Sequence, residues 1–190
     1  KLPNINDSLL YAKQVYLQFN IFNLLSENQE ISKVVLLNSK LNIKYDMNGN
    51  PNFKIFKPPK DKEKKVKINQ IYFNDSKISY IHQLKNIDIK GEPRKVLVDF
   101  EEHKQTDFSV NGDFFMQNLE VGETDYIYKK ECKIDAGFSV SDEVFYIKNS
   151  ALFIEDVQFS LAGEIEGKNV NLDISAENQK VKSVLSHMPK

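Results

Sequence analysis

Hydrophobic and polar residues alternate with a period of two along most of this chain. In AKQVYLQF (12–19), for example, Val15, Leu17 and Phe19 share one face. The same alternation recurs in KLNIKY (40–45), DFSVNGDFFM (107–116), KIDAGFSV (133–140), VQFSLAGEI (157–165) and VNLDIS (170–175). This period is typical of strands with one buried and one solvated face, so the pattern predicts a mainly β protein.

Turn signals and short helical patterns lie between the predicted strands. The predicted turns are MNGN (47–50), KGEP (90–93), KNSA (148–151) and EGKN (166–169). Two segments carry helical spacing, IFNLLSE (21–27) and VKSVLSH (181–187). We therefore expect one or two short helices beside the strands.

One segment of the chain is repeated. ISKVVLLNSKLNIKY (31–45) aligns with INQIYFNDSKISYIH (68–82), 37 residues later. The matched pairs are Ile31/Ile68, Val34/Ile71, Leu36/Phe73, Ser39/Ser76, Lys40/Lys77, Leu41/Ile78 and Ile43/Tyr80. In each copy the apolar positions change parity near Asn-Ser or Asp-Ser, which predicts a tight turn or bulge there. Such repeats favour a sheet extended by similar units over a closed globule.

Composition and charge narrow the functional classes. The 190 residues suit one domain, and 41% of them are hydrophobic, which is enough for a core. Lys and Arg total 26 against 27 Asp and Glu, and Arg94 is the single arginine, so nothing favours nucleic acid. The segment KPPKDKEKKVK (57–67) has no apolar period and predicts a mobile, solvated loop.

Three further features bear on compartment and context. Cys132 is the one cysteine, which allows no internal disulfide and fits either a reduced compartment or a bacterial periplasm. No apolar run approaches the ~18–20 residues that span a bilayer. The chain begins with Lys1 rather than Met, so we expect a section of a longer protein.

The segment DMNGNPNF (46–53) raises the question of a metal loop. Asp46, Asn48 and Asn50 alternate as oxygen ligands do in an EF-hand. However, Gly49 comes one residue early, and Lys57 occupies the position of the bidentate Glu. Asn-Gly is a strong turn pair, so the segment predicts a turn.

The remaining reactive residues give no catalytic pattern. We expect the histidines at the surface or at a sheet edge, Cys132 as a small buried or half-buried residue, and the carboxylate pairs on the solvated faces of strands. The histidines are His82, His103 and His187. The pairs on one strand face are Glu164 with Glu166 and Asp173 with Ser175. No nucleophile elbow, phosphate loop or dinucleotide fingerprint is present, so we expect no enzyme, metal or cofactor.

One apolar face per strand still has to be buried. Alternation alone favours packing against a second sheet or a closed curl, and the alternative is a partly open groove for apolar ligands. The residues predicted to line such a groove are Val34, Leu36, Leu41, Ile43, Ile71, Phe73, Ile78 and Tyr80.

The order of motifs resembles the AsmA-like family of bacterial envelope proteins. The similar features are the strand at 15–19, Asn23-Leu24-Leu25, an I-x-x-V-x-L strand at 31–36, and the D-x-x-G-x-x-N turn formed by Asp46, Gly49 and Asn52. A polar insertion and a new strand pair follow at 57–80, and the tail at 172–189 is similar to the family's strand, short helix and Leu-Pro ending. The resemblance is weakest over 84–150.

The resemblance implies an elongated, curled antiparallel sheet, shaped as a groove or half-barrel. It also implies a periplasmic section of a protein anchored in the inner membrane by a helix outside this chain. Such proteins are thought to carry phospholipid along an apolar groove during outer-membrane biogenesis, and acyl chains need no catalytic residue.

Two other functional hypotheses stay open. A non-lipid periplasmic β-module would scaffold or bind envelope proteins through an edge strand. A hydrolase or sugar-binding domain would need a polar pocket with converging carboxylates, and no pair in the sequence stands out.

Overall fold

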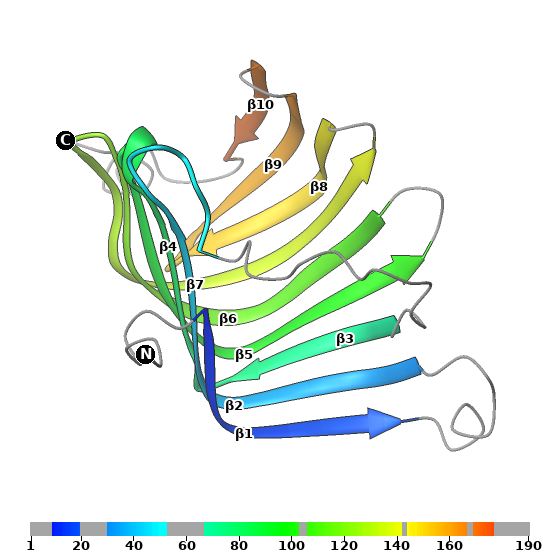
Figure 1. The fold of residues 1–190 in the computed structure, drawn as a ribbon. Coiled ribbons are helices and arrows are strands. Elements are labelled where there is room, and N and C mark those ends of the chain that lie inside the picture. Colours follow the sequence, from blue (N-terminus) through cyan, green and yellow to red (C-terminus); the bar gives the residue numbers. More distant parts are fainter. Residues whose placement is uncertain are drawn as a thin grey trace.

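The part of the chain that the structure describes is one curled sheet of ten strands (Figure 1). The computed structural model describes residues 9–19, 30–52, 67–102, 106–141, 144–166 and 169–176. The strands are β1 (Leu10–Phe19), β2 (Glu30–Tyr45), β3 (Lys67–Asn74), β4 (Lys77–His82), β5 (Ile87–Glu102), β6 (Thr106–Val121), β7 (Thr124–Ser141), β8 (Val144–Ile154), β9 (Val157–Glu166) and β10 (Asn169–Ser175). A single 3₁₀ turn, η3 (Gln83–Lys85), joins β4 to β5. The prediction of a mainly β, curled sheet is confirmed.

The strands follow one another across the sheet almost in chain order. The order is β1-β2-β3-β5-β6-β7-β8-β9-β10, and β4 continues the line of β3 between β2 and β5. Neighbouring strands are antiparallel, except that β2 runs parallel to both β3 and β4. The predicted antiparallel sheet therefore has one parallel seam, because the connection from β2 to β3 returns the chain to the end where β2 began.

The internal repeat explains this parallel seam. β2 is the first copy, β3 and β4 together are the second, and the two copies lie side by side in the register of the repeat. Ile31 is opposite Ile68, Leu36 is opposite Phe73, and the match continues to Ile43 opposite Tyr80. Like side chains therefore stack across the seam.

Both copies bend at the predicted change of parity. Asn38 and Asp75 adopt left-handed backbone conformations, each with φ of 48°. Asn and Asp tolerate this region better than other residues with a Cβ atom. The bend divides the sheet into two wings, which Figure 1 shows as the upright part around β4 and the broad part that carries β1, β3 and β8 to β10. We call these the short wing and the long wing.

The buried side chains show which face lies inside the bend. Several of them gather along the bend on the face that carries most of the apolar residues: Leu36, Ser39, Phe73, Ser76 and Val96, each 7% exposed or less. In a single layer, side chains crowd together on the concave side of a bend and spread apart on the convex side. The apolar face is therefore the inside of the bend, and we call it the inner face.

Two of the four predicted turns are wrong. KGEP (90–93) lies inside β5 and KNSA (148–151) lies inside β8, both at points where the strand register shifts. Glycine, proline and asparagine mark bulges as well as turns, which is why the signals misled. MNGN (47–50) does form a turn, and EGKN (166–169) falls at the connection from β9 to β10.

Several predictions concern residues that the structure does not describe. The two predicted helices (21–27 and 181–187) lie outside the described residues, as does the Lys/Pro-rich loop apart from Lys67, which begins β3. Among the residues that are described, no helix has the length and apolarity needed to cross a bilayer.

Candidate functional site

A continuous row of apolar side chains crosses the inner face. Each member is the direct cross-strand partner of the next, and a single glycine interrupts the row. The row runs through Val15, Leu36, Phe73, Val96, Gly112, Ile134, Leu152 and Phe159, from β1 to β9. Because strands lie about 4.8 Å apart, this row is roughly 34 Å long.

Parallel rows widen the apolar surface on both wings. On the long wing the next row is Leu17, Val34, Ile71, Val98, Val110 and Ala136. On the short wing a row runs through Ile43, Tyr80, Ile89, Leu119 and Ile127. The inner face is therefore an apolar surface that extends across the strands and over the bend.

The eight residues predicted to line a groove all lie on this face. They form four cross-strand pairs along the seam of β2 with β3 and β4: Val34 with Ile71, Leu36 with Phe73, Leu41 with Ile78, and Ile43 with Tyr80. The first two pairs lie on the long wing and the last two on the short wing. Leu36 and Phe73 belong to the buried cluster, whereas the other six are half-buried.

The sequence analysis missed a cluster of phenylalanines further along the same face. Phe100, Phe108, Phe138 and Phe145 come from β5, β6, β7 and β8, and their neighbouring ring centroids are 5.0 to 6.1 Å apart. The alternating pattern identified the strands of Phe108 and Phe138. These segments lie outside the internal repeat, however, so the sequence did not show that their rings meet.

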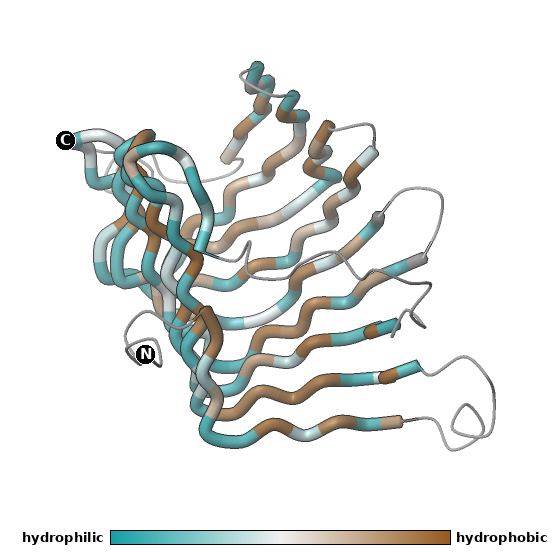
Figure 2. Tube along the Cα trace, viewed as in Figure 1, coloured by the Kyte–Doolittle hydropathy of each residue, from teal (hydrophilic) through white to brown (hydrophobic). Residues whose placement is uncertain are grey.

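The inner face has no second layer over it among the described strands. These strands contact chiefly their neighbours in the one sheet. Figure 2 shows hydrophobic positions alternating with hydrophilic ones on strands throughout the sheet. Towards the sheet edges the apolar side chains are open to solvent, with Val15 53% exposed and Ile174 61% exposed. Packing against a second sheet, which alternation alone favoured, is therefore absent from the described part.

An aromatic group borders the inner face at the end of the short wing. The His82 ring stacks on Tyr45 with a centroid distance of 4.7 Å, and Tyr80 lies at a tilt beside both. The backbone N–H of Lys85 donates a hydrogen bond to Nδ1 of His82 over 3.3 Å. Burial raises the pKa of the Tyr80 hydroxyl, with a smaller contribution from Tyr45. The prediction of a surface position is wrong for His82, which is 7% exposed, while His103 and His187 lie outside the described residues.

The segment DMNGN forms a turn, and the carboxylate of Asp46, the candidate metal ligand, is hydrogen-bonded to the backbone of this turn. Oδ1 of Asp46 accepts hydrogen bonds from the backbone N–H groups of Asn48 and Asn50, each at 2.8 Å. These bonds lower the pKa of the Asp46 carboxyl, with the Asn50 backbone the largest cause. Gly49 supplies the left-handed conformation with φ of 78°. The turn prediction for this segment is confirmed.

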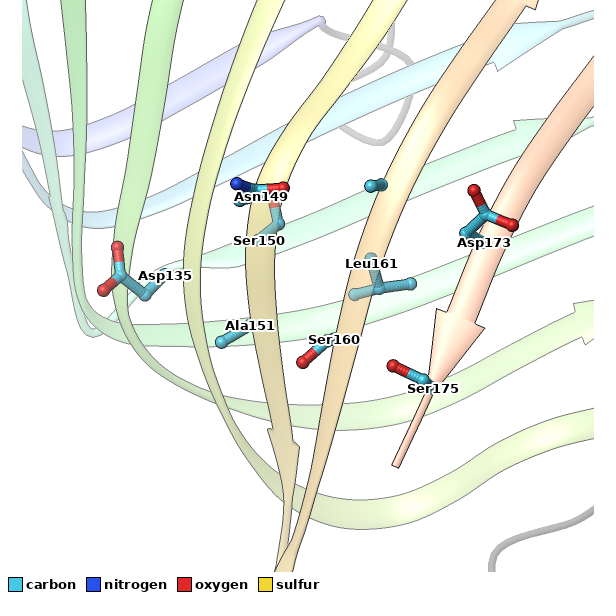
Figure 3. A pocket seen from close by; sticks show the side chains of 9 residues that line it. Asp135, Asn149, Ser150, Ala151, Ser160, Leu161, Asp173 and Ser175 are labelled. Atoms are coloured by element: carbon cyan, nitrogen blue, oxygen red, sulfur yellow. The ribbon is translucent and has the colours of Figure 1, made fainter. Parts of the chain in front are cut away.

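A polar hollow lies on the opposite face of the sheet, over β7 to β10 (Figure 3). Its volume is about 510 Å³, and Asp135 and Asp173 stand at its two sides. Three strand spacings and two residues along β10 separate their backbone positions, which is roughly 16 Å along the sheet. Paired glycosidase carboxylates are only about 5 to 9.5 Å apart. This hollow therefore lacks the converging carboxylates that the hydrolase hypothesis needs.

The other reactive residues lie where the strand pattern predicted. Cys132 is buried, and burial raises the pKa of its thiol to about 11. Glu164, Glu166, Asp173 and Ser175 are exposed. No group of three or more His, Cys, Asp or Glu side chains suited to a metal ion occurs within the described ranges.

Comparison with known proteins gives no relative for this chain. No protein-family model matches it, and neither a curated protein nor a solved structure does.

Proposed function

We propose that the inner face binds the acyl chains of lipids and that this protein is a section of a lipid conduit. The proposal is supported by the apolar rows that run from strand to strand with no second layer of described residues over them. Burying acyl chains gains about 0.8 kcal/mol per CH₂ group, so a long uncovered apolar surface has a strong affinity for them. Movement along the rows needs no catalytic group, because each row offers similar contacts.

The proposed setting is the bacterial envelope. A curled sheet with one apolar face is the form that the resemblance to AsmA-like proteins implies. On this proposal the section lies in the periplasm, an anchor outside this chain holds the protein at the inner membrane, and the cargo is phospholipid. Partner proteins of the envelope belong to the same proposal.

One observation favours a second candidate, the non-lipid β-module. β1 lies at the end of the strand order and exposes apolar or aromatic side chains on both of its faces. Such an edge suits pairing with a strand of another protein. This candidate predicts no affinity for acyl chains.

A titration with a fluorescent fatty acid separates the two candidates. The wild-type chain should bind the probe, and Ile43→Asp should weaken binding at least tenfold, since a carboxylate would lie in the path of the acyl chain. Lys40→Asp is the control, because it places a carboxylate on the same strand but on the opposite face and makes the larger change in net charge of the two variants. Wild-type protein that takes up no probe, or equal effects of the two variants, would refute the conduit.

A further inference from the structure

β1 is an exposed edge with unusual side chains. Among the described strands it pairs only with β2. Val15 and Leu17 on the inner face are 53% and 49% exposed, and Tyr11 and Tyr16 on the other face are 47% and 53% exposed. The inner face of this ten-residue strand is therefore apolar and accessible, and the other face carries accessible tyrosines beside glutamines. Figure 1 shows β1 at the edge of the sheet.

β1 lacks the features by which proteins protect such edges. Natural edge strands are short, or carry proline, several charges or bulges that prevent pairing with another chain. β1 contains no proline and one charged residue, Lys13. The register of β1 with β2 shifts once, and the extra residue there lies in β2, so β1 itself has no bulge at this point.

The opposite edge of the sheet is different. β10 has seven residues, and Asn169, Asn171, Asp173 and Ser175 alternate along it. Asn and Asp are depleted in strands, and a carboxylate at the edge opposes pairing. A head-to-tail contact of β1 with β10 is therefore the poorer match.

We propose that two copies of this chain associate through β1, with the two strands antiparallel. A pairing centred on Leu17 places Leu17 opposite its counterpart and Val15 opposite Phe19 on one face. On the other face it places Tyr16 opposite Gln18. These pairs involve residues 15–19 of each copy, are apolar or neutral, and leave Lys13 outside the paired segment.

This arrangement has a defined symmetry and a structural consequence. The contact is the same patch on both subunits, so it closes as a two-fold dimer and does not extend to a filament. The two-fold axis is perpendicular to the sheet, as in any antiparallel strand pair. Both inner faces therefore lie on the same side, and their apolar rows join across the β1 pair.

The oligomeric state of the intact chain tests this proposal. Light scattering after gel filtration, over a range of concentrations, should show a species of twice the 22.0 kDa chain mass. Leu17→Lys should raise the dissociation constant at least tenfold, because two ammonium groups would face each other across the axis. Tyr16→Lys, on the other face of β1, should also weaken the dimer, because it replaces the Tyr16–Gln18 contact on both sides of the axis with a charged side chain. Circular dichroism verifies that each variant keeps its β structure.

Ile174→Lys is the matched control, because Ile174 is at least as accessible as Leu17 and Tyr16 but lies on β10. It should leave the dimer intact, and so should Ile43→Asp, which addresses lipid binding. A monomer at every concentration would overturn the proposal. So would a dimer that both β1 variants leave unchanged, or one that Ile174→Lys disrupts as strongly.

Discussion

Two buried serines lie at the centre of the bend. Ser39 and Ser76 are each 2% exposed, and their hydroxyl oxygens are 2.7 Å apart. Ser76 Oγ also accepts a hydrogen bond from the backbone N–H of Ser39 and donates one to the carbonyl oxygen of Asn74. The hydroxyls therefore satisfy polar groups at the point where both repeat copies bend.

Removing either hydroxyl should destabilise the fold. Ser76→Ala should cost about 1–3 kcal/mol, because it leaves the buried Ser39 hydroxyl and the Ser39 N–H without their acceptor. Ser39→Ala should cost about 1 kcal/mol, because the Ser76 hydroxyl keeps its bonds to the Ser39 N–H and the Asn74 carbonyl. The double variant should cost less than the sum of the two. Urea denaturation measures these differences, with Ser160→Ala, at an exposed position, as the control. Strictly additive losses would show that the two hydroxyls do not stabilise each other.

The Cys132 thiol gives a prediction about pH. Its pKa is about 11 in the folded protein, chiefly because burial disfavours the thiolate. In the unfolded chain the thiol ionises near pH 8.5. The stability that the neutral thiol contributes is therefore complete below about pH 8.5 and is lost as the pH rises towards 11.

Unfolding curves measured between pH 8 and 11 should show this loss in the wild type and a smaller loss in Cys132→Ala. A thiol reagent should also react slowly with the native protein at pH 8, because little thiolate is present. Rapid labelling of folded protein at that pH would contradict the raised pKa.

At the scale of strands, the alternating pattern identified the strands reliably. The turn signals identified the connections between them less well. The segments around Phe108, Phe138 and Phe159 are strands as predicted, because a half-buried strand leaves period two in any sequence. The parity change of the repeat located the bend at Asn38 and Asp75. The glycine and proline of KGEP did not mark a turn, because the same residues relieve crowding inside a long bulged strand.

Gly112 shows how closely β5 and β6 approach at one such bulge. A Cβ atom on Gly112 would lie 2.0 Å from the carbonyl oxygen of Lys95, and its φ of 148° disfavours other residues. Gly112→Ala should therefore destabilise the protein by about 2 kcal/mol or more. Gly91→Ala, on the neighbouring strand, should change stability by less than about 0.5 kcal/mol, because the nearest atom to its Cβ is 3.8 Å away. Thermal unfolding distinguishes the two, and equal effects would contradict the close approach.

At the scale of the whole molecule, the sequence predicted a curled sheet. It did not predict whether that sheet forms a single layer or packs against a second one. Alternation is the same in a strand that packs on a second sheet and in one that faces an open concave surface. The repeat placed four pairs of groove residues together, because both copies carry apolar residues at the same positions. No sequence repeat relates Phe100 to Phe145. That part of the surface could therefore be recognised only from the order of the strands in the structure.

The concave apolar surface is the basis of the proposed function. Its rows cross the parallel seam and the bend, and the sheet around them is a single layer in the described residues. On the proposed function, lipid covers these apolar side chains. Acyl chains suit this role because their length and flexibility match an extended curved surface.

The most direct test is native mass spectrometry of the chain purified from bacterial cells, followed by extraction and identification of bound lipid. We predict protein masses that carry phospholipid. The lipid should be lost in Ile43→Asp and retained in Lys40→Asp, with both variants folded. A lipid-free mass for the wild-type chain, which also fails to take up added phospholipid, would contradict the conduit and favour the protein-binding module.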